Sequence, residues 1–343
     1  MAISHSLICS AAALALTLTI ATQGVGTAFG QSEQPQPPVA PAELGDGPID
    51  ETAQLGRIRA ALKDHYRLDN EDTRFFIDRN DRGFFRATRN IGLVYKRVPG
   101  ATDRVQFLGS ATLISPCFAL TAYHVVHGTE GIDDEQFVPS VDAKVEVGIF
   151  PTAGQSDQFD KRHIEATAVD PGIINLRARV WSDDFLLLRL HEKQISYLRT
   201  PVTLGHIFDR RLSRLPWQSS DEFLLAAGFA TDRIALERKI QLQGDFCQPR
   251  GANAGAGVYA DCILTKGMSG GAVFLFFHSA DGRFQSELVG VPTQPSIGNG
   301  LFAKNSNGRS LVAPLTPTKI AKIRAIIDRP TDDHCMPTDG KPW

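Results

Sequence analysis

A serine held in a glycine turn is the residue of this sequence best suited to covalent chemistry. Residues 267–274 read Gly-Met-Ser-Gly-Gly-Ala-Val-Phe, so Ser269 lies in a tight turn that leads into an apolar run. Glycine adopts positive φ and lets other groups approach the backbone closely. A hydroxyl in that setting suits acyl transfer, in which it attacks a carbonyl while backbone N–H groups stabilise the oxyanion. Ordinary hairpin turns have the same pattern, so this chemistry also needs a base and an orienting carboxylate.

The candidate base is His124, which ends the sequence Leu-Thr-Ala-Tyr-His after the apolar runs 111–114 and 118–120. A histidine in that position can equally be a hydrogen-bonded residue at the rim of a core. His124 and His127 could also form half of a metal site. No Cys or further His completes it at zinc-like spacing, so we expect no metal.

The candidate carboxylates are Asp183 and Asp184, which lead directly into the apolar run 185–190. An acid at the mouth of a buried strand can accept the Nδ1–H of a histidine. That bond fixes the tautomer, leaves Nε2 to take the serine proton and stabilises the imidazolium that forms. The alternative for either acid is an exposed turn, and the residues alone do not choose between the two.

The elements that must position these residues are predicted to be almost entirely β-strands. From residue 91 onward, short β-type runs alternate with turn residues every 8–12 positions, which indicates an all-β sandwich or barrel. One late helix is predicted over 316–327, with Thr316 as N-cap and Pro317 at its first position. The predicted strands are 91–95, 112–114, 144–150, 185–190, 223–227, 240–242, 272–277 and 288–291.

The composition and the N-terminal region predict an exported globular protein. The 343 residues are 42% hydrophobic with a net charge of −2, which predicts a sizeable core and gives no basic surplus for nucleic acid. The apolar run 7–21 is short for a membrane span, and Ala-Phe-Gly at 28–30 suits signal peptidase. We therefore predict a signal peptide over 1–30 and no stable membrane insertion. Residues 1–30 contain no Lys or Arg, so a membrane anchor stays the alternative.

The region that follows, residues 31–85, is predicted to be a linker and possible pro-segment. Residues 31–56 are rich in Gln, Pro, Ala and Glu with little apolar periodicity, which is typical of a disordered linker. The stretch 64–89 is heavily charged, with phenylalanines interspersed. We interpret its charges as a solvated surface rather than a binding site.

Export makes the cysteine count informative, because disulfides persist in oxidising compartments. Cys9 lies in the predicted signal peptide, and the other four cysteines allow three pairings. A local bridge between Cys247 and Cys262, which flank a glycine-rich loop, is favoured. Cys117 would then pair with Cys335 and tie the C-terminal tail to the body. Four free buried thiols are the alternative.

Taken together, the motifs resemble those of trypsin-like serine peptidases of the chymotrypsin fold, in the style of the bacterial extracellular, glutamyl-endopeptidase-like branch. The order His, Asp, Ser is that of the family. Residues 109–116 and 120–126 resemble its histidine motif, and 267–271 its serine motif. Residues 184–190 resemble its aspartate strand, which favours Asp184 over its neighbour.

This resemblance implies an all-β fold of two antiparallel Greek-key β-barrels with a C-terminal helix, preceded by a signal peptide and a charged extension. The implied peptidase domain covers residues 86–330, and the site lies between the barrels. Its parts are barrel one at about 86–200, barrel two at about 215–315, the helix 316–327 and a tail over 331–343.

The resemblance also implies roles for single residues. Ser269 would be the nucleophile, His124 the general base and then acid, and Asp184 the orienting carboxylate. The backbone N–H groups of Gly267 and Ser269 would form the oxyanion hole, and Val291 would line the substrate cleft. The implied protein is a secreted or periplasmic serine endopeptidase that acts on polypeptides through an acyl-enzyme without a cofactor.

Three positions refine that expectation. Met268 replaces the aspartate that, in zymogen-activated relatives, pairs with a newly freed amino terminus, so we predict no such switch. Pro292 removes one N–H from the cleft strand. Ile263 falls where the family often keeps the residue at the base of the primary specificity pocket, although Asp261 is close by. An isoleucine offers no charge partner, which favours a small or apolar P1 residue.

Two other functions stay open at this point. A catalytically inactive trypsin-like domain could act as a protein-binding module, but an intact set of three residues argues against it. A serine esterase of the α/β-hydrolase type would have the order Ser, Asp, His and alternating strands and helices. This sequence has the opposite order and few helices. The oligomeric state is not specified by any of these patterns.

Overall fold

The computed structural model describes residues 74–77, 86–97, 105–127, 145–148, 163–169, 181–194, 201–207, 222–230, 242–247, 249–253, 257–280, 284–294, 310–330 and 335. Contacts divide the chain into two units, 1–36 and 37–343, and every described residue belongs to the second unit. The predicted signal peptide over 1–30 therefore lies outside the described residues. So do most of 31–85 and most of the tail 331–343.

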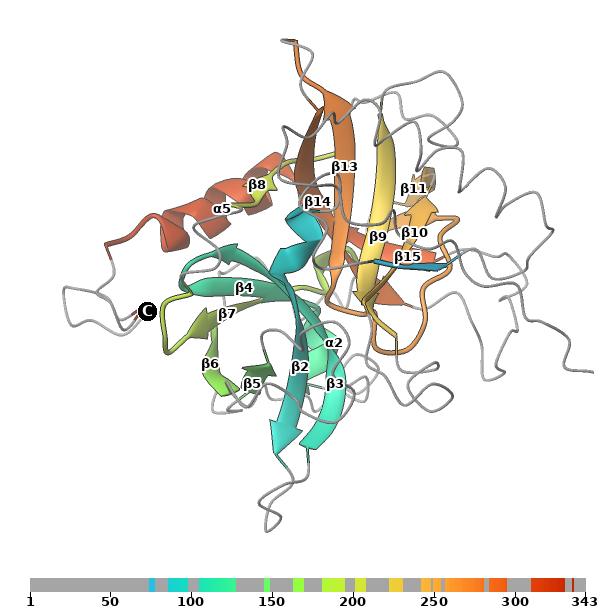
Figure 1. Cartoon of the computed structure of the whole chain (residues 1–343). Helices are drawn as coiled ribbons and strands as arrows, with labels where there is room; N and C mark the ends of the chain where they lie inside the picture. The colour runs from blue at the N-terminus through green and yellow to red at the C-terminus, as the bar shows by residue number, and fades with distance from the viewer. Residues whose placement is uncertain are drawn as a thin grey trace, which may run out of the picture. The chain divides into compact units, whose positions relative to one another are not determined.

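The first sheet is a closed barrel of antiparallel strands (Figure 1). Every residue of its strand Phe118–Thr121 is buried, and so are four of the five residues of Leu186–Leu190. Such burial explains why these strands are near-continuous apolar runs in the sequence. In spatial order, the barrel contains β2 (Ile91–Arg97), β3 (Val105–Ser115), β4 (Phe118–Thr121), β7 (Leu186–Leu190), β6 (His163–Val169) and β5 (Val145–Gly148).

The second sheet has nine strands, and its path does not close within the part of the chain that the structure describes. Its pairings are antiparallel except for β8 (Thr203–Leu204), which runs parallel to β14 (Phe284–Gln294). The path begins with β1 (Phe75–Phe76), β10 (Leu242–Cys247), β9 (Phe223–Phe229) and β13 (Ala272–His278). It continues through β14 to β15 (Ser310–Pro314), β12 (Gly257–Ala260) and β11 (Pro249–Asn253).

Helical structure is scarce among the described residues. Three short turns, η1 (Arg86–Asn90), α2 (Tyr123–His127) and η2 (Trp181–Asp183), lie next to barrel strands. The long helix is α5 (Pro317–Ile327), and the Thr316 hydroxyl accepts the N–H of Lys319 as its N-cap. The predicted all-β class and C-terminal helix are thus confirmed. None of the described helices is long and apolar enough to cross a membrane.

Strand β10 shows where local sequence preference misleads. The sequence predicted a strand over 240–242, whereas the structure has Leu242–Cys247. Gly244 and Asp245 are residue types that favour turns. Here both are buried and pair with β9, so tertiary pairing overrides the local preference.

Strand β1 lies inside residues 31–85, the stretch interpreted as a linker and possible pro-segment. Phe75 and Phe76 pair with Gly244 and Gln243 of β10, and the N–H of Ile77 donates to the carbonyl of β10's first residue at 2.9 Å. Residues 74–77 are therefore an edge of the second sheet, packed on its core.

Two cysteine pairs lie at bonding distance, and they are the two pairs expected from the sequence. The Cα atoms are 4.6 Å apart for Cys247 and Cys262, and 5.2 Å apart for Cys117 and Cys335. The first bridge joins β10 to the loop before Ser269. The second joins the turn between β3 and β4 to a residue beyond α5.

Candidate active site

His124 and Asp184 meet because their strands are neighbours in the barrel. β4 and β7 are antiparallel with Thr121 opposite Leu186, so the end of β4 lies beside the start of β7. Oδ2 of Asp184 lies 2.6 Å from Nδ1 of His124, and Oδ1 accepts the backbone N–H of His124 at 3.0 Å. One carboxylate therefore fixes both the ring and the backbone of the histidine.

The protonation of this pair follows from its hydrogen bonds. The side chains are 12% exposed for His124 and 4% for Asp184. An ionised carboxylate can only accept hydrogen bonds, so the proton between the two groups belongs to Nδ1. In the neutral ring, Nε2 is then the unprotonated nitrogen and can act as a base.

The neighbouring acid, Asp183, pairs with Lys319 of α5 instead, with 3.0 Å between Oδ1 and Nζ. The two acids that the residues alone did not separate thus have different partners. Burial lowers the pKa of Lys319, although the hydrogen bond and the charge of Asp183 act to raise it. The Lys319 ammonium also contacts the carbonyl oxygens of Ser182 and Pro314, the latter at 3.3 Å, and lies 4.6 Å from the centre of the Phe185 ring.

Ser269 is positioned by glycines on both sides. Gly267 has φ 96° and Gly270 has φ 80°, values in the left-handed region that glycine adopts readily. These two positions explain why the serine lies in a tight turn before β13. The Ser269 side chain is buried, and its hydroxyl donates to the carbonyl oxygen of Thr293 at 3.2 Å.

The turn that holds Ser269 packs against the barrel close to His124. A Cβ built on Gly270 would overlap the hydroxyl of Thr121 and lie 2.9 Å from the backbone nitrogen of Ala122. Only glycine fits this contact. Since Ala122 is two residues before His124, the fold brings the serine turn and the histidine segment side by side.

Ser110 of β3 takes part in four hydrogen bonds, two of which connect the barrel to the serine turn. Its N–H donates to the Ser269 carbonyl at 2.8 Å, and its hydroxyl donates to the Gly267 carbonyl at 2.8 Å. The hydroxyl also accepts the N–H of Phe229, and the Ser110 carbonyl accepts the Thr121 hydroxyl. The sequence showed Ser110 only as part of a motif. Its partners in the serine turn and in β9 are more than 100 positions away, so spacing could not have revealed this role.

The N–H groups of the serine turn fall into two sets. Met268, Gly270 and Gly271 donate to backbone carbonyls, which fixes the turn. Gly267 and Ser269 donate to no other residue in the described part of the chain. The two donors assigned to an oxyanion hole are therefore not used by the described parts of the fold.

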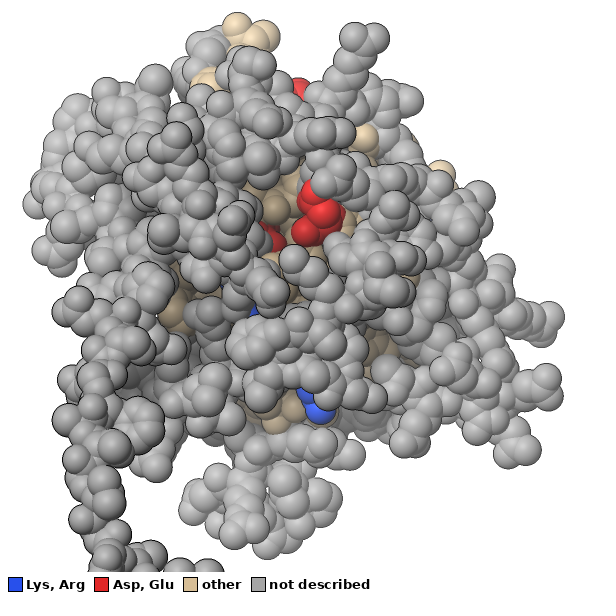
Figure 2. All heavy atoms as spheres, turned by 90° about the vertical axis from the view of Figure 1, so that its right-hand side faces the viewer, with Lys and Arg blue, Asp and Glu red and all other residues tan. Residues whose placement is uncertain are grey.

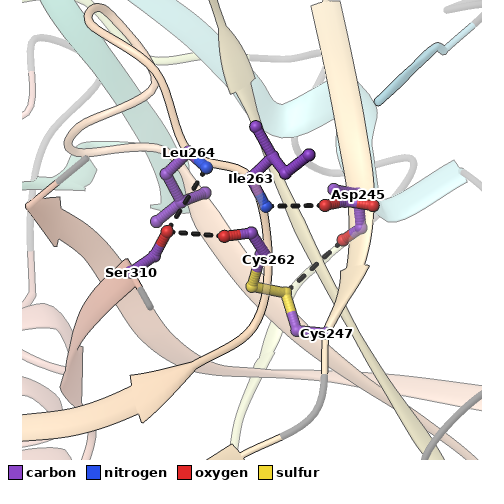
Figure 3. The surroundings of a disulfide bond; sticks show 6 residues. All are labelled: Asp245, Cys247, Cys262, Ile263, Leu264 and Ser310. Atoms are coloured by element: carbon purple, nitrogen blue, oxygen red, sulfur yellow. Dashed lines mark hydrogen bonds between the residues drawn. A yellow bond between two sulfur atoms is a disulfide. The ribbon is translucent and has the colours of Figure 1, made fainter. Parts of the chain in front are cut away.

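Ile263 lies in the loop before Ser269, where several contacts fix the backbone (Figure 3). Its N–H donates to Oδ2 of the buried Asp245 at 2.6 Å. Next to it, the Cys247–Cys262 bridge holds the loop to β10, and the Ser310 hydroxyl donates to the Cys262 carbonyl at 2.6 Å. Ile263 is partly exposed, whereas Asp245 of β10 is 1% exposed.

Val291, predicted to line the substrate cleft, is fully buried in the core as part of β14. Its side chain therefore packs in the hydrophobic core. The next two residues supply the contacts to the serine turn: the Pro292 carbonyl accepts the N–H of Gly270, and the Thr293 carbonyl accepts the hydroxyl of Ser269. The hydrogen bonds from β14 to the serine turn thus come from the two residues that follow Val291.

Among the residues that the structure describes, no three His, Cys, Asp or Glu side chains gather as metal ligands would.

Figure 2 turns the right-hand side of Figure 1 toward the viewer, and acidic side chains lie near the middle of that face. Basic side chains reach the same face lower down.

No family model matches the sequence, and no curated protein matches it. A solved structure of a Glu endopeptidase in complex with MPD is similar at 16% sequence identity and a TM-score of 0.48, covering 75% of this chain and 97% of the other. The active form of the Rv3671c protease from M. tuberculosis is similar at 15% identity and a TM-score of 0.39. That match covers 70% of this chain and 81% of the other. At such identities, the chemistry of the site has to be argued from its own geometry.

Proposed function

We propose that this protein is a serine endopeptidase whose catalytic residues are Ser269, His124 and Asp184. The observation that carries the proposal is the contact of 2.6 Å between the Asp184 carboxylate and the His124 ring. The serine turn packs beside it, with Gly270 against Ala122, two residues before His124. A buried acid that orients a histidine next to a glycine-flanked serine is the arrangement that acyl transfer requires.

In the proposed reaction, the Ser269 oxygen attacks the carbonyl carbon of the scissile peptide while Nε2 of His124 takes the serine proton. Asp184 stabilises the imidazolium. The N–H groups of Gly267 and Ser269 donate to the oxyanion, since no described group occupies them. His124 then gives its proton to the leaving amine. In the second half of the reaction, His124 takes a proton from the water that attacks the acyl-enzyme and returns it to the Ser269 oxygen.

The serine hydroxyl must change partner for this reaction to start. It donates to the Thr293 carbonyl at 3.2 Å, which is long for an O–H···O hydrogen bond. A hydroxyl has one proton, so the O–H must rotate from that carbonyl toward Nε2 of His124. A weak hydrogen bond of this length opposes the rotation only slightly.

We further propose that the substrates are polypeptides with a small or apolar P1 residue. Ile263 offers no charge to a basic or acidic side chain. The nearby carboxylate of Asp245 in β10 is buried and accepts the N–H of Ile263, which supports a role in holding the loop rather than in lining the pocket. Two disulfides support a site of action outside the cytoplasm, in the periplasm or the medium.

One observation favours a second candidate, an inactive trypsin-like domain that binds a protein partner. The Ser269 hydroxyl donates its hydrogen bond to the carbonyl oxygen of Thr293 rather than to a base in this structure. If that hydrogen bond persisted in solution, the serine would not be activated.

Labelling with a fluorophosphonate separates the two functions. We expect the purified full-length protein to be labelled at Ser269, and Ser269→Ala and His124→Ala to remain unlabelled. A folded but unlabelled wild type would refute the peptidase and support the binding module.

A further inference from the structure

Two oppositely charged side chains are buried next to the loop that leads to Ser269. Arg74 is 2% exposed and Asp245 is 1% exposed. Phe75 pairs with Gly244, so the same register places Arg74 opposite Asp245 across the β1–β10 pair. Buried charges are rare unless they have specific partners, because removing them from water is unfavourable.

Both charged groups bond to the same loop. Nη1 of Arg74 donates to the Thr265 hydroxyl at 2.9 Å, and Oδ2 of Asp245 accepts the Ile263 N–H at 2.6 Å. The carbonyl of Thr265 in turn accepts the N–H of Met268, the residue before the nucleophile. A chain of two hydrogen bonds therefore runs from the guanidinium to the serine turn.

The surroundings make these hydrogen bonds strong. Thr265 is 3% exposed and Met268 is fully buried, so water does not compete for the donors and acceptors. The ring of Phe75 stacks on Phe246 at 5.3 Å and anchors the short strand to the sheet. The segment 74–77 is thus attached by apolar packing and reaches the loop through one charged side chain.

We propose that Arg74 is a positioning residue, which sets the geometry of the loop 261–270 and so of the Ser269 turn. Met268 has no charge, so it cannot fix the Ser269 turn through an ion pair. The guanidinium of Arg74 fixes the loop instead, through its hydrogen bond to Thr265. This inference rests on the proposed function for its catalytic consequence.

The proposal constrains maturation of the protein. Any processing that yields an active enzyme must leave Arg74–Ile77 attached to the sheet. Removal of that segment takes away the buried hydrogen bond from Arg74 to Thr265, and we infer that the loop then loses its fixed geometry. The removable part of the N-terminal region therefore ends before residue 74.

The test compares Arg74→Met with Phe75→Leu in the full-length protein. Both substitutions weaken the same short strand, but only the first removes the charge next to the loop. We expect Arg74→Met to lower kcat about tenfold or more with KM changed by less than about threefold, as for a residue that acts on transition-state geometry. Phe75→Leu should lower the melting temperature and leave kcat within about twofold. Arg74→Lys should recover part of the lost kcat, because it keeps the charge.

A second readout is independent of catalysis. Amide hydrogen exchange of residues 261–270 should be faster in Arg74→Met than in the wild type, and unchanged in Phe75→Leu. Each protein is measured at a denaturant concentration equally far below its own unfolding midpoint. If Arg74→Met does not fold, Arg74→Lys and Asp245→Asn replace it in the same comparison.

The outcomes separate cleanly. Equal losses of kcat in Arg74→Met and Phe75→Leu, or exchange that rises equally in both, would overturn the positioning role and leave Arg74 as a structural residue. If the wild type is neither labelled nor active, the proposed function fails. Faster exchange confined to Arg74→Met would then still support the positioning of the loop.

Discussion

Replacing Lys319 with Met tests how Asp184, the proposed orienting carboxylate, is held. The ammonium contacts the Ser182 carbonyl and the Asp183 carboxylate, directly before Asp184. Methionine keeps the length of the side chain and removes the charge. We therefore expect the η2 turn to loosen, the contact between Asp184 and His124 to become less well defined, and kcat to fall while the fold is retained.

The expected loss of stability can be worked out from the contacts. Two backbone carbonyls lose their donor, at a net loss of about 1 kcal/mol each. The ion pair contributes up to about 1 kcal/mol, because the Asp183 side chain is 20% exposed and can be rehydrated. Removing a buried ammonium offsets part of this sum. The expected decrease in the free energy of unfolding is about 2 kcal/mol at neutral pH.

The pH dependence of that difference has a defined sign. Burial lowers the pKa of Lys319 from 10.5, so between the lowered pKa and 10.5 the unfolded chain binds more protons than the folded chain. The stability that Lys319 confers therefore rises with pH through this window, at most about 1.4 kcal/mol per pH unit. The Lys319→Met variant lacks this contribution, so the difference between the two proteins should grow as the pH approaches 10.5.

Urea denaturation of wild type, Lys319→Met and Lys322→Met at several alkaline pH values measures this difference. Lys322 is exposed on the same helix, so its substitution controls for the loss of one positive charge. A difference between wild type and Lys319→Met that shrinks with rising pH would refute the reasoning. It would mean that Asp183, rather than burial, dominates the pKa of Lys319.

Three further predictions concern the serine turn, the acid and the nearer disulfide. Gly270→Ala should lower the free energy of unfolding by about 3 kcal/mol, because φ is 80° and a Cβ would overlap the barrel; a melting temperature equal to that of wild type would contradict this. Asp184→Asn should keep the fold and lower kcat by about 10³–10⁴-fold, because the amide favours the wrong tautomer of His124; steady-state kinetics and circular dichroism measure both, and full activity would rule out the role. The double substitution Cys247→Ser with Cys262→Ser opens a loop spanning 15 positions and should lower stability by about 3 kcal/mol in urea denaturation, whereas an unchanged midpoint would show that the other contacts suffice.

Local patterns in the sequence predicted the strands whose burial is simple. β7 is buried in four of its five residues, and its apolar run is visible without any partner. β4 is buried throughout, but its residues 118–120 were noted only as an apolar run and not predicted as a strand. The helix α5 has its start encoded by Thr316 and Pro317. β10 was predicted poorly because Asp245, a turn-favouring residue, is stabilised in the strand by a hydrogen bond to the loop 18 positions away.

The same distinction applies to the candidate site. Each proposed catalytic residue lies in a local motif, so Ser269 and His124 could be selected from spacing and residue type. The residues that hold them could not, because their partners are distant: Ser110 bonds to a residue 157 positions away and Lys319 to one 137 positions away. Arg74 lies in a stretch whose charges were interpreted as solvated, and only the register of β1 shows that it is buried.

The bridge between Cys117 and Cys335 turns most of the two sheets into a covalent ring. It spans 218 positions, which include His124, Asp184 and Ser269. A single cut in any loop between the two cysteines would therefore open the ring without separating the fragments. The secreted peptidase proposed above would be surrounded by proteolytic activity, its own included. In such surroundings, a nicked molecule would remain one molecule, with its three proposed catalytic residues still tethered together.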